Sequence, residues 1–303
     1  MTTTNTNDTE ASVAQAKRII AGGGELVRLT TQGKREAENL KHINAQLRAE
    51  GITTPLCADV HFNANVADVA ALYAEKVRIN PGNYVDPGRT FKILEYTDEE
   101  YAKELKRIED RLTPFIQICK ENRTAVRIGV NHGSLSDRIM SRYGDTPEGI
   151  VESCMEFLRI FKKHDFNDIV ISIKASNTVV MVCSVRLLVS EMDKEGMNYP
   201  LHLGVTEAGE GEDGRIKSAV GIGALLNDGI GDTIRVSLSE EPECEIPVAK
   251  YLARYIRQKK GTSSYLPKLS KGSIICVLNA EKQRQWKTSV AKTCLLSSLP
   301  AMQ

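Results

Sequence analysis

The sequence predicts an α/β fold, a (β/α)8 TIM barrel that lacks most of its first strand and is followed by an irregular tail. Seven short runs rich in Val and Ile alternate with segments of helical period, which is typical of parallel βαβ units. Within the runs, residues of one parity are apolar and those of the other parity are polar. Because successive side chains of a strand point to opposite faces, helices can cover the apolar set while the polar set faces one shared lumen.

The same alternation would also fit an antiparallel sheet with one wet face. The runs are separated by helix-length segments rather than tight turns, which favours the barrel. The predicted strands are residues 25–32, 55–62, 76–83, 124–131, 168–175, 199–206 and 232–239. Clear helical segments lie at residues 10–23, 34–50, 147–164 and 214–229, and several end at a Gly stop signal. Residues 1–5 are interpreted as the end of a first strand.

The barrel domain is predicted to cover residues 1–258. Residues 259–303 lack a sustained helical period, carry a basic excess and are treated as a tail of uncertain structure. The tail contains one short β-like run, residues 274–278. We hypothesise that this run pairs in the gap between the strands at 25–32 and 232–239.

Composition limits the classes of function. Lys and Arg number 40 against 39 for Asp and Glu, so a nucleic-acid or acidic-membrane role would need local clustering of charge. No apolar stretch approaches the ~20 residues of a membrane span, and the first residues lack the features of a secretory signal. We expect a soluble cytoplasmic protein, or one of the plastid stroma if the source is a plant. The 7 cysteines lie far apart without a Cys-x-x-Cys pair, which argues against disulfides and a zinc ribbon.

The polar parity of the strands points to an anion. It includes cations from five different predicted strands, namely Arg28, Arg78, Arg127, Lys174 and Arg235. The acids assigned to the same space, Asp59 and Glu207, cannot neutralise all of these charges, and an unpaired buried cation is costly. Several guanidinium groups aimed at one point suit a diphosphate. Further neutral donors at the strand ends are Asn80, Asn131, Ser176 and Ser237.

Two histidines, His61 and His202, share the lumen parity, and each is either a hydrogen-bonded core residue or a catalyst. The sequence holds no H-E-x-x-H motif and no Walker lysine loop, and no metal site is predicted. Two alternative functions remain open. A pterin-binding transferase barrel also has Asp and Asn at its strand ends, but five converging cations suit a neutral heterocycle poorly. The second alternative is a non-catalytic phosphate-binding fragment.

Long motifs along the chain resemble one family, 4-hydroxy-3-methylbut-2-enyl diphosphate synthase of the non-mevalonate isoprenoid pathway. The matching segments are LVRLTTQ, PLCADVHFN, KVRINPGN, VRIGVNHGSLSDRIMSRYGDTPEGIVES, ISIKASN, YPLHLGVTEAGEGEDGRIKSAVGIG and GDTIRVSLSEEPECEIPVA. The resemblance covers the chain from residue 1 to about residue 257. The helical segment at residues 86–112 resembles the large-insert form of bacteria and plants.

The resemblance implies an oxidoreductase that opens the ring of 2-C-methyl-D-erythritol 2,4-cyclodiphosphate. It implies that Arg28, Arg78, Arg127 and Lys174 grip the diphosphate, with Asn80, Asn131, Arg235 and Ser237 nearby, and it gives catalytic roles to Asp59, His61 and Glu207. In the family, a [4Fe–4S] cluster in a separate C-terminal domain, held by three Cys and one Glu, receives electrons from ferredoxin or flavodoxin, and the enzyme is a homodimer. Residues 259–303 do not resemble that domain. We therefore expect this chain to supply the diphosphate-binding barrel, to lack the cluster ligands and to be inactive alone.

Overall fold

The computed structural model describes residues 1–86 and 95–260. Backbone contacts divide the chain into Met1–Tyr265 and Leu266–Gln303, and the second unit lies outside the described residues. The hypothesised strand at 274–278 lies there too, so its pairing stays a prediction. None of the helices in the described ranges is long and apolar enough to cross a membrane.

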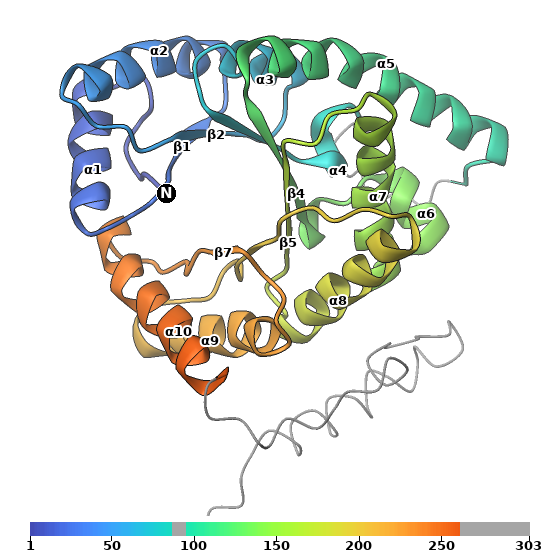
Figure 1. The fold of residues 1–303 in the computed structure, drawn as a ribbon. Coiled ribbons are helices and arrows are strands. Elements are labelled where there is room, and N and C mark those ends of the chain that lie inside the picture. Colours follow the sequence, from blue (N-terminus) through green and yellow to red (C-terminus); the bar gives the residue numbers. More distant parts are fainter. Residues whose placement is uncertain (87–94, 261–303) are drawn as a thin grey trace, which may run out of the picture. The chain divides into compact units, whose positions relative to one another are not determined.

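Parallel strands line the inside of the first unit, as the sequence predicts (Figure 1). Five of them pair in the order β1-β2-β3-β4-β5, and β6 pairs with β7 in a separate two-stranded sheet. Between the two sheets the described residues form one isolated bridge, Ile171 with Leu201, and beyond it the Thr206 amide donates to the Ala175 carbonyl at 3.4 Å. The strand bounds are β1 Val27–Thr31, β2 Leu56–Val60, β3 Lys76–Ile79, β4 Ala125–Asn131, β5 Ile169–Lys174, β6 His202–Leu203 and β7 Thr233–Ile234.

The last two strands are much shorter than the predicted runs at 199–206 and 232–239. Both runs are extended beyond the assigned strands, since the Arg235 amide donates to the Leu203 carbonyl at 2.9 Å. Within the described residues, no ladder pairs β7 with β1. Residues 1–4 lie beside β1 instead, where the Thr2 amide donates to the Arg28 carbonyl at 2.8 Å without forming a strand.

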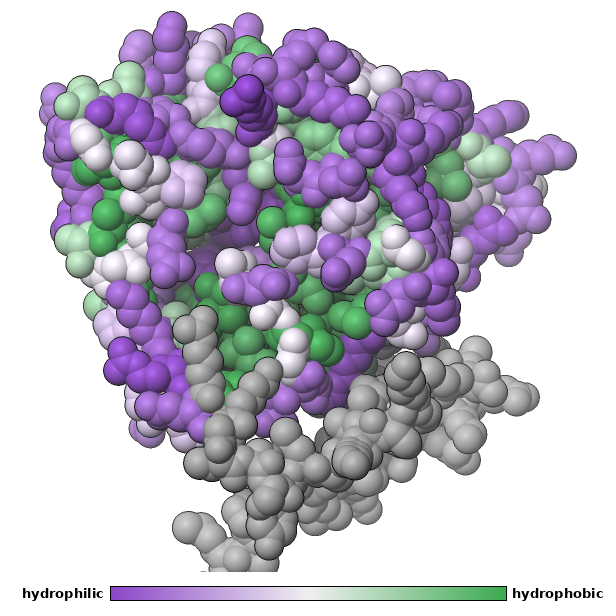
Figure 2. Space-filling view, in the orientation of Figure 1, coloured by the Kyte–Doolittle hydropathy of each residue, from purple (hydrophilic) through white to green (hydrophobic). Residues whose placement is uncertain are grey.

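Helices form the outer ring around the strands (Figure 1). Their bounds are α1 Thr9–Ala21, α2 Lys34–Ala49, α3 Ala64–Ala70, α4 Pro81–Tyr84, α5 Asp98–Asn122, α6 Asp137–Tyr143, α7 Pro147–Lys163, α8 Thr178–Lys194, α9 Gly211–Asn227 and α10 Glu245–Lys260. Two short 3-10 turns, η1 His132–Ser134 and η2 Pro242–Cys244, lie in the connections. The outer helical surface is mainly hydrophilic, whereas hydrophobic residues show toward the middle of the same face (Figure 2).

Helix α5 differs from the predicted helical segment at 86–112. It begins at Asp98, because a capping box at Thr97 and Glu100 satisfies free amides at that point. The Thr97 hydroxyl accepts from the Glu100 amide at 3.2 Å, and the Glu100 carboxylate accepts from the Thr97 amide at 2.9 Å. The helix then continues through Pro114 to Asn122.

The core lies between the strands and the outer helices. Apolar strand residues such as Leu29, Ile79 and Ile128 are fully buried there, against side chains such as Phe115 of α5 and Phe157 of α7. This arrangement confirms the predicted parity, since the polar residues of the same strands are left to face the lumen.

Candidate anion-binding site in the barrel lumen

The predicted cations lie on neighbouring strands at several depths of the lumen. Arg78 is the register partner of both Asp59 on β2 and Arg127 on β4. Lys174 ends β5 beside Asn131. Arg28, Arg78 and Arg127 therefore stand within their strands, whereas Lys174 stands at the end of its strand.

Asp59 is the carboxylate at the centre of this cluster. Its oxygens lie 3.3 Å from Arg28 Nε, 3.3 Å from Arg78 Nη1 and 3.9 Å from Arg127 Nη2. Its side chain is 1% exposed. Burial acts to raise the pKa of Asp59, but the three guanidinium groups outweigh burial and hold this pKa well below its usual range. Asp59 is thus a permanent anion that holds three arginines together.

Several polar atoms of the cluster remain without hydrogen bonds in the described part of the chain. Arg28 Nε, Arg127 Nε and Asp59 Oδ2 are buried and have no such partner there. Burial, partly opposed by Asp59, lowers the pKa of Arg28 to about 10, so this guanidinium stays charged near neutral pH. One carboxylate shared among three arginines leaves positive charge and free donors for a ligand.

Arg235 has a carboxylate partner that the sequence reasoning missed. Glu245, the first residue of α10, accepts from Arg235 Nε at 3.0 Å and from Arg235 Nη2 at 2.8 Å. The acids named from the sequence were Asp59 and Glu207 only. Glu245 belongs to the family segment GDTIRVSLSEEPECEIPVA, but it lies outside the strand runs, so the alternation of the strands does not place it in the lumen.

Glu207 itself is not brought to the cations. It is exposed, has a left-handed backbone with φ 52, and forms no ion pair with the cluster in the described structure. Its carbonyl oxygen accepts from Lys217 Nζ at 3.0 Å. Ser176 is also exposed, whereas Ser237 is half-buried.

Asn80 and Asn131 are joined by Ser134 of η1. Asn80 Nδ2 donates to Ser134 Oγ at 2.8 Å, and Ser134 Oγ lies 3.2 Å from the Asn131 carbonyl. Asn80 also caps α4, since its Oδ1 accepts from the Gly82 amide at 3.4 Å. These contacts fix the two chain segments that follow β3 and β4.

A second buried ionic group, which the sequence analysis does not predict, lies where α5, α6 and α7 meet the end of α4. Arg138 of α6 donates to both Glu156 carboxylate oxygens at 2.7 Å and to Asp86 Oδ2 at 3.2 Å. Tyr101 of α5 donates to Glu156, and the Arg138 guanidinium lies over the Tyr101 ring. The group joins α5, α6 and α7 to the end of α4, and it supports the segment that carries Ser134.

Because Gly129 has no side chain, the Arg78 side chain can pack directly against the backbone of β4. A Cβ atom at Gly129 would lie 2.3 Å from Arg78 Nε, and the Gly129 carbonyl accepts from Arg78 Nη2 at 2.7 Å. A glycine between Arg127 and Asn131, at a position of lumen parity, is the sequence signal that indicates this close approach.

The two lumen histidines differ in their contacts. His61 is half-buried, with Nε2 3.8 Å from Asp59 Oδ2. Burial, partly opposed by Asp59, lowers the pKa of His61. His202 Nδ1 lies 2.8 Å from Thr233 Oγ1, and burial with Arg127 and Lys174 brings the pKa of His202 well below its usual value. Both imidazoles are therefore neutral at pH 7, and His202 Nε2 is buried without a hydrogen bond to the described residues.

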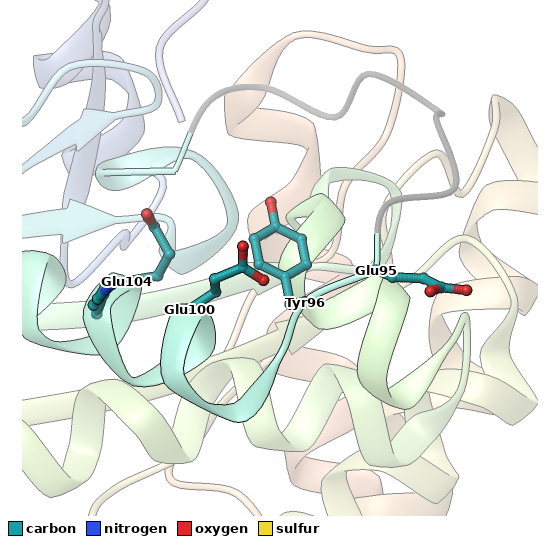
Figure 3. A pocket seen from close by; sticks show the side chains of 5 residues that line it. Glu95, Tyr96, Glu100 and Glu104 are labelled. Carbon is teal, nitrogen blue, oxygen red and sulfur yellow. The ribbon is translucent and has the colours of Figure 1, made fainter.

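A cavity of about 640 Å³ reaches this cluster from the side at which the strands begin. Its lining includes Arg28, Arg127, His202, Arg235 and Glu245. A smaller hollow of about 340 Å³ lies at the start of α5 and is lined by Glu95, Tyr96, Glu100, Lys103 and Glu104 (Figure 3). Its acidic lining does not suit an anion, and it contains none of the lumen residues.

A metal cluster does not fit the described residues. Within residues 1–86 and 95–260, no three His, Cys, Asp or Glu side chains converge as metal ligands. Cys57, Cys119, Cys154 and Cys183 are buried singly and Cys244 is exposed, without a disulfide among them.

Comparisons with known proteins agree with this geometry. A family model described as the GcpE TIM-barrel domain matches residues 1–250. A protein of Bacteroides fragilis (strain ATCC 25285) named 4-hydroxy-3-methylbut-2-en-1-yl diphosphate synthase (flavodoxin) is 75% identical over 267 residues, which are 88% of this chain and 42% of that protein. A protein of the same name from Porphyromonas gingivalis is 56% identical over 264 residues, which are 87% of this chain and 45% of that protein.

The chain thus spans less than half the length of these relatives. Among solved structures, the D-allulose 3-epimerase of a Methylomonas species aligns with a TM-score of 0.52 at 12% identity, over 84% of this chain and 93% of that one. This likeness shows a shared fold alone.

Proposed function

The chain belongs to the GcpE TIM-barrel family, and from that premise we propose that its barrel binds the diphosphate of a cyclic substrate for reductive ring opening. The substrate would be 2-C-methyl-D-erythritol 2,4-cyclodiphosphate, and the activity that of a 4-hydroxy-3-methylbut-2-enyl diphosphate synthase. The observation that carries the proposal is the charge of the lumen, where Arg28, Arg78 and Arg127 share the single carboxylate of Asp59.

We assign a separate role in ligand binding to each of the lumen residues. Arg28, Arg127 and Lys174 would meet the phosphoryl oxygens, because the Nε atoms of Arg28 and Arg127 are buried without a hydrogen bond to the described residues and Lys174 makes no ion pair with them. Asp59 would keep the arginines aligned, and His61 at the end of β2 would exchange a proton with the bound ligand. We assign binding of the outer phosphoryl oxygens to Asn131 and Ser237, and secondary contacts to Asn80, Arg235 and Ser176. Glu207 keeps the catalytic role predicted from the resemblance, at the rim of the barrel.

Reduction requires a redox group beyond the described residues. In the family resemblance a [4Fe–4S] cluster would supply the electrons, and the described residues offer no ligand set for it. Flavodoxin is the electron donor we propose, because the names of both relatives specify it. The role of this barrel is therefore to bind and orient the diphosphate, within a homodimer in the complete enzyme.

Thermal unfolding with added pyrophosphate tests the binding. A ligand that binds only the folded state stabilises it by RT ln(1+[L]/Kd), about 2.7 kcal/mol at a hundredfold excess over Kd. We expect Arg127→Ala to lose most of this gain. Arg35→Ala, which alters an exposed arginine of α2, serves as the matched control and should keep it.

The cyclic diphosphate and its unphosphorylated parent alcohol, 2-C-methyl-D-erythritol, extend the test to the substrate class. Calorimetric binding of the first but not of the second is expected. Equal gains in Arg127→Ala and Arg35→Ala, or equal binding of the two compounds, would contradict a diphosphate site in the lumen.

A further inference from the structure

Among residues 1–86 and 95–260, Lys174 is the predicted lumen cation without an ion pair to an acid. Its side chain is buried, and its ammonium makes no ion pair or hydrogen bond with the residues that the structure describes. Gly204 of the neighbouring run lies against its methylene chain, since a Cβ atom there would be 3.3 Å from Lys174 Cε. Lys174 is therefore enclosed by the barrel, with 7% of its surface exposed.

The groups around Lys174 are mostly cations. Both nearby carboxylates already have partners, because Asp59 lies among three arginines and Glu245 binds Arg235. The charged and titratable groups that interact electrostatically with Lys174 are Arg28, Arg78, Arg127, Arg235, His202 and the amino group of Met1. Asp59 and His61 lie next to Arg28 and Arg78 in the same lumen, and Glu245 pairs with Arg235. A positive charge on Lys174 is thus opposed from several sides.

Lysine can relieve this repulsion in a way that arginine cannot. A guanidinium keeps its proton throughout the physiological range, whereas a buried ammonium gives it up readily. Burial, and after it Arg28 and Arg127, lower the pKa of Lys174 well below its usual value. An anion placed between Lys174 and the arginines would reverse that balance.

We propose that Lys174 is an uncharged amine in the empty site and takes up one proton when a phosphate-type anion binds. This inference rests on the proposed function of the barrel and specifies how its site is regulated. Binding and protonation are then linked, so each favours the other by the same factor. Anion affinity should fall as the pH rises, by up to tenfold per pH unit, above the pKa of Lys174 in the empty site.

Sulfate is the probe that isolates the proton on the protein, because it stays a dianion across the relevant pH range whereas pyrophosphate itself titrates. Calorimetry of sulfate binding at about pH 8 in two buffers of different ionisation enthalpy counts the protons taken up. We expect close to one proton per bound sulfate in the full chain. Lys174→Arg should bind sulfate with little proton uptake and little pH dependence, because its guanidinium is charged before and after binding.

A second variant separates Lys174 from the other titratable groups. His202→Gln should keep the proton uptake of the unchanged chain, whereas Lys174→Met should lose it together with part of the affinity. Met1 and His61 are present in every variant, so their contributions cancel in the comparison.

The outcomes distinguish this inference from the function on which it rests. Binding of sulfate and pyrophosphate without proton uptake, or uptake that persists in Lys174→Arg, would overturn the role of Lys174 and leave the diphosphate site intact. Failure of both anions to bind would overturn the site and the inference together.

Discussion

At the scale of single residues, Asp59 determines how the lumen charges are arranged. Its carboxylate lies within 3.3 Å of Arg28 and of Arg78. Removing one partner from a buried ionic group leaves the others uncompensated, at a cost of about 3–5 kcal/mol. We predict a loss of that order for Asp59→Asn in urea unfolding at neutral pH. Asp110→Asn, which alters an exposed partner of Lys106, should change stability by less than about 0.5 kcal/mol.

We also expect the stability difference between the unchanged chain and Asp59→Asn to depend on pH. The folded-state pKa of Asp59 lies below the unfolded value, so its charge contributes stability that is complete above the unfolded pKa of about 4. This contribution is lost as the pH falls through the folded pKa. The stability gap between the unchanged chain and Asp59→Asn should therefore be constant above about pH 5 and narrow below about pH 4. A gap that widens in acid would show that Asp59 is not held as an anion.

At the scale of an element, β4 leaves room for the Arg78 side chain in the lumen, because Gly129 has no side chain. Because a Cβ at Gly129 would overlap the Arg78 side chain, Gly129→Ala must displace that guanidinium. We predict pyrophosphate binding about 10- to 100-fold weaker, the equivalent of one charge-assisted hydrogen bond. Gly223→Ala in α9 is the matched control, since the nearest atom, Leu252 Cδ1, lies 3.7 Å from the added Cβ. An unchanged Kd for Gly129→Ala would mean that Arg78 has no part in binding.

The strands could be predicted from the sequence, whereas the contacts made by helix residues could not. The strands β1 to β5 and their lumen parity follow from local alternation, because a residue's face in a strand depends only on its position along the chain. Glu245 and Arg138 could not be found in that way. Each meets its partner through the packing of helices, and although both belong to segments that match the family, neither lies in a strand whose alternation would place its side chain.

At the scale of the whole molecule, the family could be identified from long motifs, and the family match over residues 1–250 confirms it. The placement of the motif residues could not be read from the sequence in the same detail. Glu207 and Ser176 belong to the matching segments yet lie exposed at the rim, while Arg28 and Arg127 lie inside the lumen. A motif shows which residues a family uses, whereas the depth of each in the barrel depends on strand stagger.

In the described residues, one isolated bridge between Ile171 and Leu201 joins β5 to β6, and no ladder joins β7 to β1, so we expect the β6–β7 pair to open locally at both of its edges. Amides of β1 to β5, held in a continuous ladder, should exchange with deuterium only on global unfolding, and amides of β6 and β7 through cheaper local opening. Lys174 on β5 and Arg235 just after β7 stand on opposite sides of the edge between β5 and β6. A bound pyrophosphate that contacts Lys174 and Arg235 would connect the two sheets. It should therefore slow amide exchange in β6 and β7 far more than in β2 and β3. Equal slowing in all strands would mean that the ligand does not bridge the two sheets.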